Sequence, residues 1–295
     1  MAKILTIFTP TYNRCNTLIY LYESLCKQTR KYFSWIIVDD GSVDNTSELI
    51  NTWIHDDIIN IEYYRTDNYG KPHATNLSLD KCESKLWMCV DSDDYLADNA
   101  VDLIINAYNI IKNDNSCGGI IANLHSFNGN VLGNKELPKK SDFINDSDIR
   151  YKFNINVDLL RIFKTSVIQK YRYPIIQGEK FIGESYLYEK INAKYYIIRD
   201  RLYFAEYRSD GLTANCLRLH VNNPRGYKIL KEQVMVTPKG LIWKIKGAIL
   251  YIAACKLCGD KKIIQNSQNK TLVFCVYPIG IFAYCVRYKR IKDKK

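Results

Sequence analysis

Residues 35–46 of the 295-residue chain read WIIVDDGSVDNT, a pattern that indicates the fold class. Four consecutive apolar residues, rich in branched and aromatic side chains, end at two aspartates and a glycine, as a buried strand does where it enters a turn. Residues 44–46 then predict a cap for a helix over 47–53. Strand, acidic turn and helix in this order form the repeating unit of an α/β sheet.

The same unit recurs on both sides of this stretch. Short apolar runs predict further strands at 4–8, 61–64, 86–90 and 120–124. Apolar residues recur at helical spacing between residues 18 and 25. Alternating strands and helices predict parallel strands with crossover helices, so the expected fold class is an α/β sandwich whose ligands bind at the carboxyl ends of the strands.

Beyond residue 124 the pattern is less regular. Residues 128–155 are polar and rich in turn-forming residues, which predicts a loop or connecting excursion. A mixed pattern then predicts a strand near 157–163, a helix near 184–192 and strands within 195–204.

Charge divides the chain into two regions. The formal net charge is +11, yet residues 228–295 hold 15 basic and three acidic residues, whereas residues 1–227 hold 27 basic and 28 acidic ones. A nucleic-acid enzyme normally places its cations around the active groove. We therefore predict a near-neutral catalytic domain over 1–227, a basic region over 228–295, and no nucleic-acid partner.

The basic region has the composition of a membrane-docking segment. Apolar residues recur at helical spacing from Leu241 to Ile252, and an apolar, aromatic run over 272–286 is followed at once by a basic tail. The run is short for a spanning helix, which needs about 20 apolar residues. These features suit the interface of an anionic leaflet. A buried core helix with a solvated charged tail is the alternative.

Ten cysteines lie scattered along the chain, and the first residues lead straight into an apolar run. We therefore expect no secretory signal and a reducing, cytoplasmic compartment in which the thiols stay free. Cys255 and Cys258 form one CxxC pair, and without a second ligand pair it does not predict a zinc site.

Polar motifs follow three of the predicted strands: TPTYNR at 9–14, DDGS at 39–42 and DSDD at 91–94. Carboxylates gathered at one sheet edge repel one another unless a cation lies between them. Hard oxygen ligands suit Mg²⁺ or Mn²⁺, with other coordination positions left to phosphate oxygens. A lone aspartate at a strand end often merely caps the next helix, but two clusters favour a metal that stabilises a leaving diphosphate.

These motifs, in this order, resemble those of the family 2 glycosyltransferases. The resemblance covers residues 3–98 closely and is carried by TPTYNR, WIIVDDGSVDNT, NYGKPHATN at 68–76 and CVDSDD at 89–94. It continues through residues 178–184 and 206–213, which look like those of bacterial enzymes that build cell-surface polysaccharide. It implies the GT-A fold, a Rossmann-like nucleotide-sugar-binding sandwich, here followed by a mainly helical, basic appendix.

For the nucleotide base, the resemblance implies a role for the first two motifs. Pro10 and Tyr12 would frame the base, with the Tyr12 ring against uracil, and Arg14 belongs to the same nucleotide-binding set. Asp39 would accept a hydrogen bond from the base N3–H. The alternative for Tyr12 is a buried ring that packs beneath the strand.

For the diphosphate, the resemblance implies that Asp91 contacts the ribose or the metal and that Asp93 binds the bridging Mn²⁺ or Mg²⁺. Lys71 opens a predicted helix after a turn, where a cation beside backbone N–H groups favours an anion. We assign Lys71 to the diphosphate, with a solvated lysine as the alternative. Asp94 faces the donor sugar or acceptor, or it caps the following helix.

An inverting transfer needs a base opposite the leaving group that takes the proton of the acceptor hydroxyl. In the family, an acidic pair at a helix start supplies this base. Glu184 occupies the matching place, but Gly183 precedes it instead of an acid. We assign Glu184 as the base, and Glu179 is the alternative, with a structural or acceptor-facing role otherwise.

Together these features predict an inverting, metal-dependent glycosyltransferase, peripherally associated with the cytoplasmic face of the membrane. A UDP-sugar is the expected donor, and a lipid-linked or other saccharide for capsule, exopolysaccharide or O-antigen is the expected acceptor. A sugar-phosphate nucleotidyltransferase would need a glycine-rich loop after the first strand, which TPTYNR does not supply. The remaining alternative is a non-catalytic basic protein that binds membranes or nucleic acid.

Overall fold

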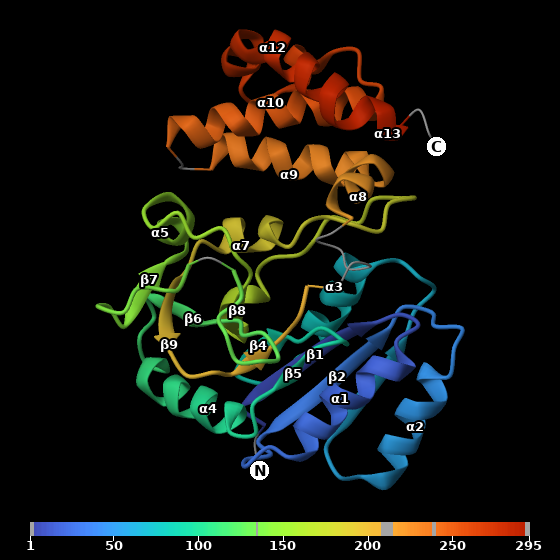
Figure 1. Cartoon of the computed structure of the whole chain (residues 1–295), viewed down its shortest axis with the longest axis vertical. Coiled ribbons are helices and arrows are strands. Elements are labelled where there is room, and N and C mark those ends of the chain that lie inside the picture. Colours follow the sequence, from blue (N-terminus) through green and yellow to red (C-terminus); the bar gives the residue numbers. More distant parts are fainter. Residues whose placement is uncertain (1–2, 134, 208–214, 238–239, 293–295) are drawn as a thin grey trace. The chain divides into compact units, whose positions relative to one another are not determined.

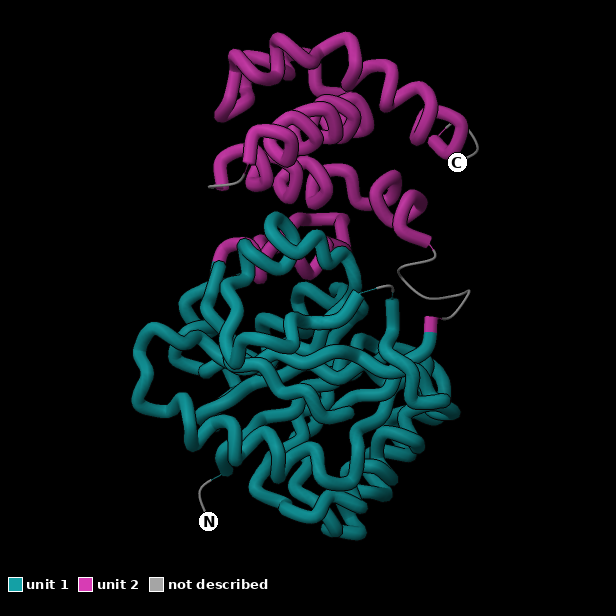
Figure 2. Tube along the Cα trace, turned by 60° about the vertical axis from the view of Figure 1, so that its left-hand side comes forward, with its two compact units in different colours: residues 1–172, 191–206 teal, residues 173–190, 207–295 magenta. Residues whose placement is uncertain are grey.

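The computed structural model describes residues 3–133, 135–207, 215–237 and 240–292. The chain forms two compact units, which are described separately: unit 1 comprises residues 1–172 and 191–206, and unit 2 comprises residues 173–190 and 207–295 (Figure 2). Part of the motif at 206–213 lies outside the described residues.

The expected boundary between residues 227 and 228 differs from this division, because it falls inside the helix α9 (Pro224–Val236). Residues 173–190 also pack with the C-terminal helices, although the sequence groups them with the catalytic domain. The net charge of the sequence becomes positive from about residue 228 onward. The two packed units instead divide where the chain leaves the sheet, after residues 172 and 206.

Unit 1 is built on a mixed eight-stranded sheet with the order β3-β2-β1-β4-β8-β6-β9-β7 (Figure 1). The strands are β1 (Leu5–Thr11), β2 (Phe33–Asp39), β3 (Ile61–Arg65), β4 (Leu86–Cys89), β6 (Cys117–Asn123), β7 (Phe143–Asn145), β8 (Leu159–Lys164) and β9 (Lys194–Ile198). A separate antiparallel pair joins β5 (Tyr95–Leu96) to β10 (Tyr203–Phe204).

The first half of the sheet is parallel, as the alternating pattern predicts. β1 pairs in parallel with both β2 and β4, and β2 pairs in parallel with β3. The helices of this unit are α1 (Cys15–Cys26), α2 (Thr46–Asp56), α3 (Lys71–Lys81), α4 (Ala100–Ile111), α5 (Asp146–Tyr151) and α6 (Thr165–Ile168). All seven residues of β2 are buried, because α/β packing covers both faces of a parallel strand.

The segment 128–155, expected as a loop, contains β7 and α5. Arg161 on β8 explains part of this difference, since its Nη2 lies 3.0 Å from Oδ1 of Asp146 at the start of α5, with both side chains mostly buried. Such short elements are stabilised by tertiary contacts, so local sequence gives little sign of them.

Unit 2 is helical. Its helices are α7 (Ser185–Ile191), α8 (Cys216–Asn222), α9, α10 (Leu241–Cys258), α11 (Ile263–Asn266), α12 (Lys270–Tyr284), the π-helical turn η1 (Cys285–Lys289) and α13 (Arg290–Lys292). α10 packs against α9 on one side and α12 on the other (Figure 1). Gly280 permits the close approach of α12, because a Cβ there would lie 2.6 Å from Cβ of Ile252.

The helix that begins in the apolar run of the C-terminal region continues through η1 and α13. Among the described residues, the stretch Lys270–Lys292 is long and apolar enough to cross a membrane, by length and composition alone. It is therefore longer than the run over 272–286 indicates, because the helix extends past that run into the basic residues.

Candidate active site

The carboxyl ends of β1, β2 and β4 share one edge of the sheet. Thr11 and Asp39 are register partners at the ends of β1 and β2. Beyond the last residue of β4, the N–H of Val90 donates to the carbonyl of Phe8 on β1 at 2.8 Å. The three polar motifs therefore begin side by side, as the predicted topology requires.

The end of β1 and the loop after it carry Pro10, Tyr12 and Arg14. The N–H of Asn13 donates to Oγ of Ser42 at 2.9 Å, which ties this loop to the one after β2. Pro10 and Arg14 are partly buried, whereas Tyr12 is 44% exposed. The Tyr12 ring therefore does not pack beneath the strand, and it presents a surface on which a flat base can stack.

Asp39 is fully buried at the end of β2. Its Oδ1 accepts a hydrogen bond from the N–H of Ser42 at 2.8 Å, and its Oδ2 accepts one from the hydroxyl of Tyr63 at 2.9 Å. Both oxygens thus hold the turn and the neighbouring strand. Each retains a second lone pair, and the residue has no exposed surface in this structure.

Asp40 anchors the loop that precedes α3, a role that the motif alone does not reveal. Its Oδ1 accepts from the N–H of Tyr69 and its Oδ2 from the N–H of Gly70, both at 2.7 Å. Gly41 permits this close packing at φ +82°, because a Cβ there would lie 3.0 Å from the carbonyl oxygen of Thr66. The buried carboxylate of Asp40 thereby fixes where α3 begins.

Lys71, the first residue of α3, pairs with the third motif. Its Nζ lies 2.6 Å from Oδ1 of Asp91, and its side chain is 18% exposed. Lys71 is therefore not the solvated lysine of the alternative interpretation. The N-terminal end of a helix and an ammonium group together create a positive potential beside the acidic loop.

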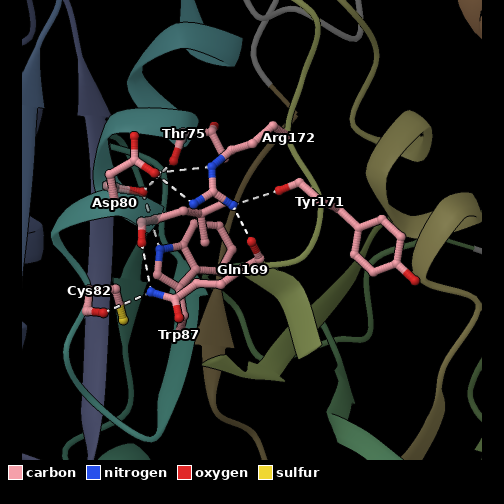
Figure 3. Close-up of polar contacts among 9 residues, drawn as sticks. Thr75, Asp80, Cys82, Trp87, Gln169, Tyr171 and Arg172 are labelled. Carbon is pink, nitrogen blue, oxygen red and sulfur yellow. Dashed lines mark hydrogen bonds and ion pairs between the residues drawn. The ribbon is translucent and has the colours of Figure 1, made fainter. Parts of the chain in front are cut away.

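The other end of α3 is tied to the segment after β8 (Figure 3). Arg172 donates from Nε and Nη2 to Oδ1 of Asp80, at 3.1 and 2.6 Å. Nε2 of Gln169 donates to the carbonyls of Leu79 and Cys82, at 2.8 and 2.9 Å. These carbonyls lie at the helix end, where intrahelical partners are lacking. The helix that carries Lys71 is thus held at both ends.

Tyr203 on β10 holds the DSDD loop. Its hydroxyl donates to Oδ2 of Asp94 at 2.6 Å and accepts from the N–H of Asp91 at 3.0 Å. The sequence gives no sign of this contact, because Tyr203 lies more than 100 residues away in a two-residue strand. Asp94, 8% exposed, is thus bonded to the second sheet and does not face open solvent.

The acidic loop generates a strong negative field. Burial, together with the charges of Asp91 and Asp93, raises the pKa of Asp94 to about 8, against the lowering effects of the Tyr203 hydrogen bond and the Lys71 charge. A carboxyl group with such a pKa holds its proton at neutral pH. The loop therefore favours a cation beside Asp91 and Asp93.

Within the described ranges, no group of three or more histidine, cysteine, aspartate or glutamate side chains is arranged to hold a metal ion. Asp91 and Asp93 nevertheless supply hard carboxylate oxygens on one short loop. Mg²⁺ is typically bound through one or two carboxylates together with substrate phosphates. This donor set fits a divalent ion whose coordination is completed by a diphosphate.

The two candidate bases both belong to unit 2 and differ in environment. Glu179 accepts from the N–H groups of Arg225 and Gly226 at the start of α9, at 2.9 and 2.7 Å. Its side chain is 5% exposed, so its carboxylate caps a helix. Glu184 is exposed just before α7, where the hydroxyl of Tyr188 donates to its Oε2 at 3.0 Å.

Glycosyl transferase family 2 matches residues 6–172, more than half of the chain and most of the eight-stranded sheet. The chain belongs to this family. The matched range contains all of the donor-side candidates, from Pro10 to Asp94, whereas Glu179 and Glu184 lie beyond it.

Two curated relatives of this glycosyltransferase have names that specify what they act on. It is 29% identical over 177 residues to the teichoic acid poly(glycerol phosphate) polymerase of Staphylococcus epidermidis, covering 56% of this chain and 22% of the polymerase. It is 24% identical to the GalNAc(5)-diNAcBac-PP-undecaprenol beta-1,3-glucosyltransferase of Campylobacter jejuni, covering 91% of this chain and 88% of that enzyme. The chain thus spans under a quarter of the first relative's length.

Solved structures confirm the GT-A fold. Residues 1–349 of TarS from S. aureus, in complex with UDP-GlcNAc, align with a TM-score of 0.65 at 14% identity, covering 99% of this chain and 92% of that one. The mannosyltransferase PcManGT of Pyrobaculum calidifontis, in complex with GDP-Man and Mn²⁺, aligns with a TM-score of 0.53 at 15% identity, covering 97% and 88%.

Proposed function

We propose that this glycosyltransferase moves a sugar from a UDP-sugar to a lipid-linked or other saccharide acceptor, with inversion at the anomeric carbon. The observation that carries the donor half is the Lys71–Asp91 pair at the carboxyl edge of the parallel strands. A cation and a carboxylate fixed there suit a metal-bound diphosphate. The TarS complexes with UDP and UDP-GlcNAc support the choice of nucleotide.

Each donor-side residue has a defined role in this proposal. The ring of Tyr12 stacks on uracil, Pro10 and Arg14 frame the nucleotide, and Asp39 accepts from the base N3–H. Lys71 donates to the diphosphate when the donor displaces Asp91 from it. Because α3 fixes the position of Lys71, its contact with the leaving diphosphate costs little conformational entropy.

Asp91 and Asp93 hold Mn²⁺ or Mg²⁺ in this proposal. When bound, the ion supplies neutralisation of the charge that develops on the leaving diphosphate. The Mn²⁺ in the PcManGT structure supports a divalent ion as cofactor. Asp94 keeps the loop in shape through its hydrogen bond with Tyr203, and its expected place facing the donor sugar or acceptor stays a prediction.

Glu184 acts as the base that takes the proton of the acceptor hydroxyl. It is the exposed carboxylate of the two, with the Tyr188 hydroxyl to orient it. The carboxylate of Glu179 accepts hydrogen bonds from two N–H groups at the start of α9, which supports a structural role.

The acceptor assignment is supported by the relatives, whose names specify teichoic acid and an undecaprenol-linked saccharide. We place the enzyme in capsule, exopolysaccharide or O-antigen synthesis, on the cytoplasmic face of the membrane.

A donor screen followed by product analysis tests this proposal. The protein is incubated with Mn²⁺, a panel of nucleotide sugars, and either undecaprenyl-diphosphate-linked oligosaccharides or soluble ones. We expect one UDP-sugar to be consumed, with NMR of the product showing the opposite anomeric configuration to the donor. Retained configuration contradicts inversion. Salt-sensitive nucleic-acid binding without any release of UDP or GDP supports the non-catalytic alternative.

A further inference from the structure

An apolar stripe runs along the outer face of α12 and η1 in unit 2. Four of its side chains are more than half exposed: Phe274 (68%), Ile279 (54%), Phe282 (67%) and Val286 (60%). Cys275, Pro278 and Cys285 are exposed between them. The spacing is four residues along positions 274, 278, 282 and 286, and three or four residues along positions 275, 279 and 282, so these positions lie on one side of the helix.

The opposite side of the same helix is buried within unit 2. Val273 and Val276 belong to a cluster that includes Ile252 of α10, and Tyr288 bonds through its hydroxyl to that of Tyr227 at 2.9 Å. Because Gly280 lets the helix lie directly against Ile252, α12 packs as one layer of a helical stack. A helix that crossed a bilayer alone would have to abandon these contacts.

Cations lie at both ends of the stripe. Lys270 begins α12, and Lys289 and Arg290 follow the last exposed apolar residue. Between Asp260 and Asp293 the sequence has seven basic residues and no acidic one. Two copies of this face brought together would repel each other, whereas an anionic surface would attract each copy.

We infer that the outer face of α12 and η1 is a docking surface for an anionic lipid bilayer. Phe274, Ile279, Phe282 and Val286 enter the interface between headgroups and acyl chains, while Lys270, Lys289 and Arg290 contact lipid phosphates. The helix lies in the plane of the interface and does not span it. This surface would hold the enzyme at the membrane that the proposed function requires. It lies in unit 2 alone, and lipid binding by it requires neither donor nor acceptor.

Vesicle sedimentation of the full chain tests the surface. We expect binding to phosphatidylcholine vesicles that contain phosphatidylglycerol, weak binding without it, and release by high salt. Changing Phe274 and Phe282 to Ser should weaken binding at least tenfold. Changing Lys289 and Arg290 to Glu should abolish the preference for the anionic lipid, because each cation near such a surface contributes a factor of about five.

A matched control changes two exposed apolar residues of unit 1, Ile54 and Ile58, to Ser. This control should bind vesicles as the wild type does. Thermal unfolding and calorimetric UDP binding of all variants separate loss of docking from loss of fold or of donor binding.

Three results overturn the inference. The first is undiminished vesicle binding by the folded Phe274/Phe282 variant. The second is resistance of the bound wild type to extraction at alkaline pH, which indicates a spanning helix. The third is a dimer of the wild type, seen by sedimentation velocity, that is lost only in the Phe274/Phe282 variant, while that variant still binds vesicles as the wild type does.

Discussion

Nζ of Lys71 lies 2.6 Å from Oδ1 of Asp91, so the cation assigned to the diphosphate and a carboxylate assigned to the metal neutralise each other across the donor site. Their side chains come from a helix start and a strand end that are 20 residues apart. When a metal and a diphosphate bind, Asp91 would pair with the metal and Lys71 with the diphosphate. The pair therefore holds both groups in position before the donor arrives.

Removal of the Lys71 charge should weaken donor binding. For Lys71→Gln we expect the affinity for UDP with Mn²⁺ to fall about 10- to 100-fold, since hydrogen bonds to charged groups contribute about 1.5–3 kcal/mol. Isothermal titration calorimetry measures this change. Lys81→Gln, at the other end of the same helix, is the control and should bind UDP normally; equal affinities for the two variants would refute the role of Lys71.

Loss of the Tyr203 hydroxyl should loosen the acidic loop. Tyr203→Phe leaves Asp94 and the N–H of Asp91 without their partner, and we expect the free energy of unfolding to fall by about 1–3 kcal/mol. UDP affinity measured with Mn²⁺ should fall as well, because Asp91 and Asp93 are no longer held. Tyr95→Phe on the paired strand, which keeps its ring stacked 5.0 Å from Phe204, is the control. Similar behaviour of both variants would mean that the hydroxyl does not position the loop.

Substitution of the two glutamates should show different roles, with Glu184 as the base and Glu179 as a helix cap. Glu184→Gln should reduce kcat by about 10²–10⁴-fold, the usual contribution of a general base, with the melting temperature and UDP affinity unchanged. Glu179→Gln should lower the melting temperature, because α9 loses charged hydrogen bonds at its N-terminus, with a smaller effect on kcat. Steady-state kinetics and thermal denaturation of both variants check this, and the reverse pattern would make Glu179 the base.

The sheet edge that carries the donor-side candidates could be predicted from sequence. The WIIV run and its acidic turn indicate β2 because a buried parallel strand needs continuous apolar residues, and register then aligns Asp39 with Thr11. The contacts of Tyr203 could not be predicted, since a two-residue strand leaves no periodic pattern. The capping role of Glu179 could not be predicted from sequence either, because it too depends on a contact between distant residues. It depends on α9 beginning at Pro224, far along the chain.

Acid should destabilise unit 2 through His220, which stacks on Tyr227 at 3.8 Å between ring centroids. Burial, with the charges of Lys231 and Arg287, lowers the pKa of His220 to about 4. The unfolded chain binds a proton near pH 6.5, so the contribution of His220 to the free energy of unfolding should fall as pH drops from 6.5 to 4, by up to about 3 kcal/mol. The raised pKa of Asp94 acts in the opposite direction over this range, so the effect of His220 is the difference between the wild type and a variant that lacks the imidazole.

Urea denaturation across this pH range measures the effect. His220→Phe keeps a stacked ring, and on acidification from pH 6.5 to 4 it should gain up to about 3 kcal/mol of stability relative to the wild type. A variant whose pH profile matches that of the wild type would exclude a role for His220.

In the proposed mechanism, the DSDD loop holds a divalent ion that binds the donor diphosphate. Calorimetric titration of UDP into the wild type, Asp93→Ala and the neighbouring control Asp98→Ala, with Mn²⁺ and with EDTA, measures this role of the loop. We expect tight binding by the wild type and the control only with Mn²⁺, and weak binding by Asp93→Ala in both conditions. UDP affinity unchanged by EDTA and by Asp93→Ala would contradict the metal role.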